Sequence, residues 1–308
     1  MNRWTLAVIF MTLLHAGLAQ HENDLLFGVQ GGALTVIQPQ PHPVRTMAAV
    51  PGAFLLDVGV DFYYEGGAPQ LRSCRIIQRW ISPGLVGSRS GMGQLFCVSG
   101  CPNFFDLPTG GTAHHHFIFS TATPGVYIWD CQAVNGIATD GVPVSDMPWV
   151  YRIYMVAGNP ARLYGEVSPA SDYVGNLYSL TLTVQVRQMG QPLLSQNLPP
   201  NVDAIYPYMV GFNRTGSATV IAKLSKHLSR RLDNFTLGDV ARVDWQFPYA
   251  GDINGDDVID DADLLTVLFA FGQTGSNLTE DVNGDGTVDD ADLLTVLFNF
   301  GLVGEGSR

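Results

Sequence analysis

The sequence predicts a mostly β protein that ends in a small helical module. Two observations lead to this prediction. About 230 residues after the N-terminus are rich in glycine, proline and β-forming residues, with strand-length apolar runs and almost no helical periodicity. The chain then repeats itself: GDINGDDVIDDADLLTVLFAFG begins at Gly251, and EDVNGDGTVDDADLLTVLFNFG begins at Glu280. We therefore expect one or two β-sandwich (Ig-like) domains followed by a small α domain.

The N-terminus has the pattern of a signal peptide. Arg3 precedes an apolar run from Trp4 to Leu14, and Gly17 and Ala19 stand at the −3 and −1 positions of a cleavage site. The run is too short for a membrane-spanning helix, and no later segment is long and apolar enough to be one. We expect residues 1–19 to be removed and the mature protein to be secreted or held at the cell surface.

Residues 20–158 are predicted to form the first β-sandwich. Apolar or alternating runs of strand length recur between turn residues, at 33–37, 54–64, 74–81, 117–119, 126–131 and 150–156. The turn residues Gly158-Asn159-Pro160 are taken as the domain boundary. The expected second sandwich covers residues 159–249.

Four cysteines in an exported chain indicate two disulfides, for which three pairings exist. We favour Cys97 with Cys101, across a three-residue turn. The remaining pair is then Cys74 with Cys131, which would join two predicted strands. A metal site formed by cysteines with the nearby histidines is the alternative.

The cluster His114-His115-His116 is the most chemically suggestive feature of the first domain. Alternate residues of a strand share a face, so His114 and His116 would lie together while His115 points away. Two neutral imidazoles are good ligands for zinc or copper, but a closed site needs further ligands that the nearby sequence does not supply. A structural, partly solvated histidine cluster is therefore the favoured interpretation, and a metal site is the alternative.

The second predicted sandwich contains strand-like runs at 180–187, 208–210 and 218–224. Its segment TVIAKLSKHLSRR, from Thr219 to Arg231, leads into a further strand and then into the repeats. In this order it resembles the carboxypeptidase-regulatory-like sandwich of exported bacterial proteins. That resemblance implies a spacer or adhesive module without catalysis.

Each repeat begins with a twelve-residue loop rich in oxygen donors. Calcium binds six to eight oxygens, and an EF-hand loop offers them at positions 1, 3, 5, 7, 9 and 12, with a backbone carbonyl at position 7. The residues at these positions are Asp252, Asn254, Asp256, Val258, Asp260 and Asp263 in the first repeat, and Asp281, Asn283, Asp285, Thr287, Asp289 and Asp292 in the second. The sequence therefore predicts two bound calcium ions.

Position 6 of the loop distinguishes the two repeats. This position makes a sharp turn and is normally glycine, as in Gly286, but the first repeat has Asp257 there. Aspartate enters the left-handed backbone region at modest cost, so the first loop is expected to close and to bind more weakly. The loop with Gly286 is predicted to be the tighter site.

The pair of repeats resembles a dockerin domain over residues 250–303. Both repeats have Asp at position 12 instead of Glu, an aliphatic residue at position 8 (Ile259 and Val288), and a leucine-rich helix that ends near Phe-Gly. The residues before Gly251, 245–250, are predicted to be strand or linker, whereas a complete EF-hand has a helix before its loop. The resemblance implies two loop–helix half-EF-hands that fold around calcium and bind a cohesin domain of a scaffold protein. Residues 304–308 form a short tail.

Two features depart from the dockerins of cellulosomes. Positions 10 and 11, commonly a Ser/Thr pair, are Asp261-Ala262 and Asp290-Ala291, and neither helix carries a basic residue. The expected helices at 264–271 and 293–300 are also apolar nearly all round, so more than one side of each must be covered. The partner is therefore either a cohesin-like protein or this chain's own β domain.

The acidity of the chain is confined to the repeats. Thirteen acidic residues and one basic residue lie from Asp252 onward, and fifteen of each lie before it, so the repeats account for the whole formal net charge of −12. The body of the protein is balanced, which argues against a nucleic-acid partner.

Catalysis finds little support in the sequence. Glu22, Glu65 and Glu166 are the only glutamates between the expected signal peptide and the repeats, no acid and nucleophile pair of a glycosidase is recognisable, and Gly-x-Ser-x-Gly is absent. If the protein were an enzyme, the dockerin resemblance would imply a polysaccharide-acting hydrolase.

Polysaccharide binding is a further alternative, because sandwiches can present aromatic side chains to sugar rings. The candidates are Tyr63, Tyr64, Trp80, Trp129 and Trp149. The competing interpretation places these large aromatics in the core. The sequence favours a non-catalytic extracellular protein with a calcium-dependent module for assembly.

Overall fold

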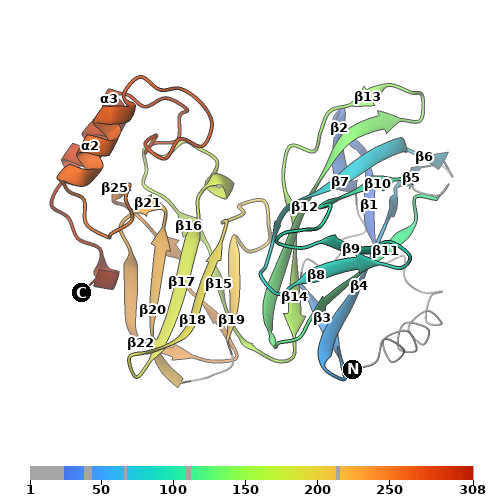
Figure 1. Cartoon of the computed structure of the whole chain (residues 1–308), viewed down its shortest axis with the longest axis horizontal. Coiled ribbons are helices and arrows are strands. Elements are labelled where there is room, and N and C mark those ends of the chain that lie inside the picture. Colours follow the sequence, from blue (N-terminus) through green and yellow to red (C-terminus); the bar gives the residue numbers. More distant parts are fainter. Residues whose placement is uncertain (1–23, 38–43, 66–67, 109–111, 213–215, 308) are drawn as a thin grey trace. The chain divides into compact units, whose positions relative to one another are not determined.

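The computed structural model describes residues 24–37, 44–65, 68–108, 112–212 and 216–307. The expected signal peptide, residues 1–19, lies outside them. Strands dominate the described residues, and both of the α-helices found there lie in the C-terminal repeats, so the prediction of a mostly β fold is confirmed (Figure 1). No helix of this part of the chain has the length and apolarity to span a bilayer.

The chain divides into two compact units. The first comprises residues 1–123 and 128–155, and the second comprises residues 124–127 and 156–308. The main division thus falls between Met155 and Val156, close to the turn at Gly158. The second unit holds both the second β region and the two oxygen-rich repeats.

Most strands of the first unit belong to one twelve-stranded sheet. Its strands follow the order β10-β7-β12-β14-β3-β4-β11-β8-β9, with β1 beside β4, β2 beside β1, and β13 beside β12. The strands are β1 (Leu25–Gln30), β2 (Ala33–Ile37), β3 (Val44–Val50), β4 (Ala53–Phe62), β7 (Leu71–Ile81), β8 (Val86–Arg89), β9 (Gly93–Phe96), β10 (Phe104–Leu107), β11 (His115–Thr121), β12 (Gly125–Ala138), β13 (Pro143–Val144) and β14 (Tyr151–Ala157). A separate short hairpin pairs β5 (Tyr64–Glu65) with β6 (Ala68–Pro69).

An aromatic core explains how this sheet closes on itself. Strand β11 alternates between buried and partly exposed residues, which sends Phe117 and Phe119 inward. The ring of Phe119 lies 4.9 Å from that of Trp129 on β12, and Phe96 on β9 lies 5.0 Å from the same indole. Since β9 and β12 are far apart in the strand order, these contacts pack two halves of the sheet face to face, as in a sandwich.

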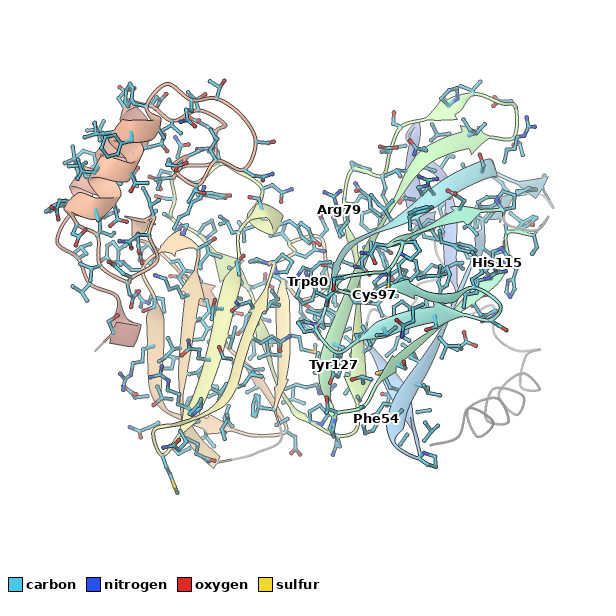
Figure 2. All side chains as sticks on the ribbon, in the orientation of Figure 1. Phe54, Arg79, Trp80, Cys97, His115 and Tyr127 are labelled. Atoms are coloured by element: carbon cyan, nitrogen blue, oxygen red, sulfur yellow. A yellow bond between two sulfur atoms is a disulfide. The ribbon has the colours of Figure 1, made fainter. Side chains whose placement is uncertain are left out.

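The disulfide prediction is correct for one pair and wrong for the other. Cys97 and Cys101 are bonded, with their Cα atoms 5.7 Å apart (Figure 2). Cys74 and Cys131 are buried free thiols on the neighbouring strands β7 and β12. Cys131 stands opposite Gln78, which is four residues from Cys74 and therefore about 13 Å along the strand, too far for a disulfide. Burial raises the pKa of Cys74 to about 12, which makes this thiol unreactive.

The second unit contains a sandwich of shorter sheets. A four-stranded sheet has the order β18-β17-β20-β22, a three-stranded sheet has the order β19-β15-β23, and β16 pairs with β24. The strands are β15 (Ala161–Gly165), β16 (Val167–Ser168), β17 (Leu182–Gln188), β18 (Gln191–Leu198), β19 (Tyr208–Phe212), β20 (Gly216–Leu224), β22 (Arg230–Leu237), β23 (Val240–Arg242) and β24 (Trp245–Gln246), and a 3-10 turn, η2, spans Leu177–Ser179. Strand β17 buries Leu182, Val184 and Val186 on one face, the alternation expected for a sheet with one side on a core.

A short pairing connects the sandwich to the repeats. Strand β21 (Lys226–His227) pairs with β25 (Ala250–Asp252), and β25 ends at the first residue of the first oxygen-rich loop. Two helices follow, α2 (Asp261–Ala270) and α3 (Asp290–Phe298), and a final turn, η3, spans Glu305–Ser307. The helices lie beyond one end of the sandwich strands (Figure 1).

Both helices begin earlier than their apolar runs, because each has a capping box. The side chain of Asp260 accepts from the N–H of Ala262, and the side chain of Asp263 accepts from the N–H of Asp260. Asp289 and Asp292 repeat the arrangement at α3. The same aspartates are positions 9 and 12 of the loops, so helix capping and loop closure use common residues.

Candidate metal centre

Loop 1 (residues 252–263) and loop 2 (residues 281–292) are closed by matching hydrogen bonds. At position 1, Asp252 accepts from the backbone N–H of Gly255 at 2.8 Å, and Asp281 accepts from Gly284 at 2.8 Å. Their second oxygens accept from the N–H of position 6, at 3.0 Å in loop 1 and 2.9 Å in loop 2. The first carboxylate therefore sets the curvature of each loop.

The carboxylate at position 12 ties the start of each loop to its helix. One oxygen of Asp263 accepts from the backbone N–H groups of Ile253 at 2.7 Å and Asn254 at 3.1 Å, and the other accepts from Asp260 at 3.1 Å. Asp292 makes the corresponding three contacts in loop 2, at 2.6, 3.1 and 2.9 Å. Aspartate is thus long enough to bridge both ends of the loop.

The loops bury negative charge at both ends. The carboxylates at positions 1 and 12 of both loops are buried. Burial raises the pKa of Asp252 despite its contact with Lys223, and burial raises the pKa of Asp292 despite three backbone donors. Ionised carboxylates so close together are costly to bury without a compensating cation.

The donor set fits a hard cation. Each loop offers four carboxylates, one asparagine amide and a backbone carbonyl, which are the oxygen ligands that calcium prefers. In this structure the side chains at positions 3 and 5 turn to the loop backbone instead: Asn254 accepts from Asp256 N–H at 2.8 Å, and Asp256 accepts from Val258 N–H at 2.9 Å. Among the residues described, no three His, Cys, Asp or Glu side chains are gathered into a metal-holding group. Calcium binding stays a prediction.

Short backbone pairings interlock the two repeats. In loop 1, the backbone carbonyl of Ile259 at position 8 accepts from the N–H of Gly301, just after α3, at 2.8 Å. In loop 2, the carbonyl of Val288 accepts from the N–H of Gly272, just after α2, at 2.8 Å. Both side chains are fully buried. They lie in one core whose members come from both repeats and from the β region: Ala170, Leu228, Ala250, Ile259, Val267, Ala270, Val282, Val288 and Val296.

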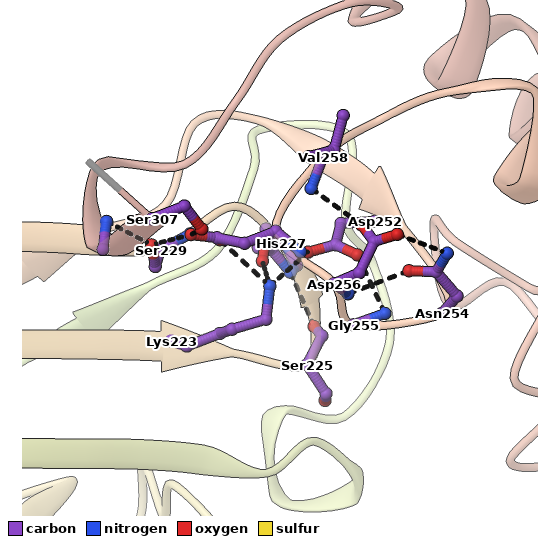
Figure 3. Close-up of polar contacts among 12 residues, drawn as sticks. Lys223, Ser225, His227, Ser229, Asp252, Asn254, Gly255, Asp256, Val258 and Ser307 are labelled. Atoms are coloured by element: carbon purple, nitrogen blue, oxygen red, sulfur yellow. Dashed lines mark hydrogen bonds and ion pairs between the residues drawn. The ribbon is translucent and has the colours of Figure 1, made fainter.

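Asp257, the departure at position 6, anchors loop 1 to the sandwich. Its backbone has φ of 74°, and its carboxylate accepts from Ser229 N–H at 2.7 Å, Ser229 Oγ at 2.5 Å and Ser307 Oγ at 2.7 Å (Figure 3). Lys223 Nζ lies 3.2 Å away. Burial opposes ionisation, but these donors outweigh it and hold the pKa of Asp257 below its usual value. Gly304 leaves room, because a Cβ there would lie 2.1 Å from Asp257 Oδ1.

Two lysines of the sandwich reach the two loops. Lys223, on β20, donates to the carboxylate of Asp252 and, at 3.1 Å, to the carbonyl of His227. Lys226, on β21, donates to backbone carbonyls of Leu278, at 2.8 Å, and Asp281. Burial lowers the pKa of Lys226. Each loop therefore has a cationic neighbour, which is bonded to the carboxylate at position 1 in loop 1 and to backbone carbonyls in loop 2.

Loop 2 is also packed against the segment before β17. The N–H of Val174 donates to the carbonyl of Asn283 at 2.7 Å, and Thr295 Oγ1 on α3 donates to Asp172 at 2.9 Å. Gly175 and Gly284 approach so closely that a Cβ on Gly284 would lie 2.7 Å from Gly175 Cα. Part of the apolar surface of the repeats is thus covered by the chain's own β region.

Another part of that surface is exposed, and it is duplicated. Phe269 on α2 is 85% exposed and Phe298, its counterpart on α3, is 82% exposed. The exposed apolar face comprises Leu265, Leu268, Phe269, Phe271, Leu294, Leu297, Phe298 and Phe300. Large contiguous apolar faces of this kind commonly mark binding sites.

The histidine cluster has the predicted alternation. His115 is buried and lies 2.9 Å from Arg89, whereas His114 and His116 lie together on the other face. Their Nε2 atoms are 2.9 Å apart, and their Nδ1 atoms contact Asp61 at 3.1 Å and Asp57 at 2.8 Å. No third His, Cys, Asp or Glu ligand joins them among the described residues.

The candidate sugar-binding aromatics do not form one exposed row. Trp129 is fully buried in the core of the first unit, and Tyr63, Trp80 and Trp149 are partly buried. Tyr64 alone of the five is more than half exposed, at 52%. No observation in the described residues favours a sugar platform.

Sequence reasoning missed the residues that hold loop 1 to the sandwich. Lys223, Ser229 and Ser307 carry no motif, and their role depends on the fold. The one available signal was Asp257 itself, because an aspartate at a turn that prefers glycine requires a compensating contact.

Comparison with known proteins gives no family for this chain. No protein-family profile matches it, and no curated protein matches it. Two similar solved structures are mutants of a type II cohesin–X–dockerin complex from Acetivibrio cellulolyticus, with 20% and 21% identity and TM-scores of 0.37 and 0.35. Each match covers 47% of this chain and 99% of that chain. A third is BcpA, the major pilin subunit of Bacillus cereus, with 6% identity, 67% of each chain covered and a TM-score of 0.23.

Proposed function

We propose that this protein is an exported, non-catalytic β-rich component of a cell-surface or extracellular assembly. Its C-terminal module, residues 250–303, binds two calcium ions and then docks to a protein partner of the cohesin type. The observation that carries the proposal is the combination, in one module, of two matching oxygen-rich loops with a duplicated exposed apolar face.

Calcium supplies positive charge between carboxylates that are already arranged by the backbone. Asp263 and Asp292 connect each loop to the first turn of its helix, so a cation held by these oxygens stabilises helix and loop together. Without it, four carboxylates per loop repel one another at close range. The helices should therefore depend on calcium, and so should the apolar face that they present.

Two different surfaces serve the two kinds of contact. The sandwich contacts the loops and the buried side of the helices, through residues such as Lys223, Ser229 and Asp172. The side chains of the exposed apolar face remain accessible to solvent beside those contacts. Packing on the chain's own β region and docking to a partner are thus compatible, and the first would orient the module for the second.

The test uses the full chain and a panel of purified cohesin domains in biolayer interferometry. We expect calcium-dependent binding that chelator abolishes. Phe269→Ala together with Phe298→Ala should weaken it at least tenfold without loss of helix content, because both rings are exposed. Phe104→Ala, an exposed phenylalanine of the first unit, is the matched control and should bind normally. Binding to no cohesin in calcium, or equal binding in chelator, would contradict the proposed docking.

A further inference from the structure

A second cluster of metal-binding side chains lies in the first unit, outside the calcium loops. His114 precedes β11 and His116 lies within it, opposite Gly59 of β4. Three carboxylates surround the pair: Asp57 and Asp61 on β4, and the buried Asp24 before β1. His115, between the two, faces the opposite side of the sheet and does not take part.

Hydrogen bonds hold both nitrogens of each imidazole. Asp61 Oδ2 lies 3.1 Å from His114 Nδ1, and Asp57 Oδ1 lies 2.8 Å from His116 Nδ1. A carboxylate accepts hydrogen bonds only, so each Nδ1 donates, and the contact between the two Nε2 atoms is an N–H···N hydrogen bond in which one nitrogen donates and the other accepts. Carboxylates in this position also orient histidine ligands and increase their basicity at metal sites.

The two Nε2 atoms meet at the partly exposed end of the pair. His114 Nε2 and His116 Nε2 are 2.9 Å apart, and both side chains are about one-third exposed. One proton lies between these nitrogens, and a metal ion that took its place would receive a lone pair from each of them. The strand fixes the spacing, because residues two apart on one face of a strand bring their side chains together.

The charge of the surroundings also favours a cation. Asp24 lies 3.7 Å from His114 Nδ1, in a space that a side chain on Gly59 would fill, since a Cβ there would lie 1.9 Å from Asp24 Oδ1. The buried Arg45 is one fixed positive charge acting on Asp24 and Asp57. Three carboxylates facing a single guanidinium leave excess negative charge around the histidine pair.

The nitrogen spacing is close to that of two adjacent ligands of one metal ion. If a metal replaced the proton without moving the nitrogens, metal–nitrogen distances of about 2.0 Å would give an angle of about 90° at the metal. That angle belongs to square-planar or octahedral coordination, the preference of copper(II) and nickel(II), and is narrower than the tetrahedral angle of zinc. Water would complete the coordination at the exposed side.

We propose that His114 and His116 form a two-nitrogen site for a divalent transition-metal ion of the copper(II) type, with Asp57 and Asp61 as positioning residues. This site is independent of the calcium loops and of the docking face. It would add a metal-binding function to the β unit of the protein.

The test is copper(II) titration of the full chain with calcium saturating, so that both loops are filled before copper is added. The readouts are the number of copper equivalents bound and the nitrogen hyperfine pattern in electron paramagnetic resonance. We expect His114→Asn together with His116→Asn to lose one equivalent and its two-nitrogen signal. Asp57→Asn should keep that equivalent but bind it about 10- to 100-fold more weakly. Asp106→Asn, another exposed carboxylate of the same unit, is the matched control and should leave binding unchanged.

Two results would overturn the site. One is a double variant that binds as many copper equivalents as the unaltered protein with the same affinity. If that variant fails to fold, the unaltered protein labelled with ¹⁵N-histidine decides: absence of coupling from two imidazole nitrogens would reject the proposal. Neither result bears on calcium binding, which the loops' own titration measures.

Discussion

Loop 1 and loop 2 have the same ligand positions and the same internal hydrogen bonds, but different surroundings. Loop 1 is held by charged and hydroxyl side chains, with Asp257 at the centre of contacts from Lys223, Ser229 and Ser307. Loop 2 is held by its backbone, through Lys226 and through the close approach of Gly284 to Gly175. Duplicated sequences thus acquire different roles once each copy meets a different part of the same sandwich.

The comparison changes the interpretation of position 6. In loop 2, Gly286 serves the turn, and a Cβ there would meet only the carbonyl of Gly275 at 3.6 Å. In loop 1, Asp257 accepts the strain of a positive φ and uses its carboxylate to anchor the loop. The departure from glycine is an added structural contact. It need not weaken calcium binding through the turn itself.

Removal of calcium should produce the largest effect. In chelator we expect α2 and α3 to lose protection from amide hydrogen exchange while β17 and β20 keep theirs, because each ion contributes about 4 kcal/mol at a thousandfold excess over its dissociation constant. Magnesium is the matched control ion. If both helices stay equally protected in chelator, neither loop needs a cation and the comparison fails.

Exchanging the two position 6 residues should separate the roles of the loops. Asp257→Gly loses charge-assisted hydrogen bonds, which should lower the free energy of unfolding by about 3 kcal/mol. Glycine also relieves the strain of the positive φ, which should restore about 1 kcal/mol and leave a net loss of about 2 kcal/mol. Gly286→Asp is the reciprocal variant and should cost only about 1 kcal/mol, for its positive φ. Chemical denaturation in calcium measures both. Equal losses would show that Asp257 is not an anchor.

The glycines at position 4 test the backbone packing of loop 2. Gly284→Ala should destabilise the protein by about 2 kcal/mol more than Gly255→Ala, because its Cβ would meet Gly175 Cα at 2.7 Å. Gly255 has a similar positive φ but nothing within 4 Å of the added carbon, so it controls for backbone strain. Thermal unfolding in calcium gives the difference, and a difference near zero would mean that loop 2 is not packed there.

Substitution of Lys223 should give the smallest effect, which is a change in the calcium affinity of loop 1. Replacing it by methionine removes a positive charge that competes for the carboxylate of Asp252, so calcium affinity of loop 1 should rise about tenfold, or about 1.4 kcal/mol. Lys226→Met is the control, because its contacts are to backbone carbonyls, and its effect on loop 2 should be smaller. Calcium titration by calorimetry measures both. A fall in affinity with Lys223→Met would show instead that the lysine positions Asp252.

The local features of the protein were predictable from its sequence. The β content, the disulfide between Cys97 and Cys101, and the placement of His114 and His116 on one face all follow from nearest-neighbour geometry. That Cys74 and Cys131 are free thiols was not predictable, because their separation depends on strand register: Cys131 stands opposite Gln78, far from Cys74. The carboxylates near the histidines were equally hidden, since β4 lies more than fifty residues earlier.

The two oxygen-rich loops, their capping aspartates and the confinement of acidity to the last part of the chain all follow from the sequence, because loop closure and helix capping depend on spacing over a few residues. The contacts of each loop depend on the tertiary fold. Lys223, Ser229 and Asp257 meet because β20, the segment between β21 and β22, and loop 1 converge in space. Long-range pairing of this kind leaves no periodic signal in the sequence, and it is what makes two nearly identical repeats unequal.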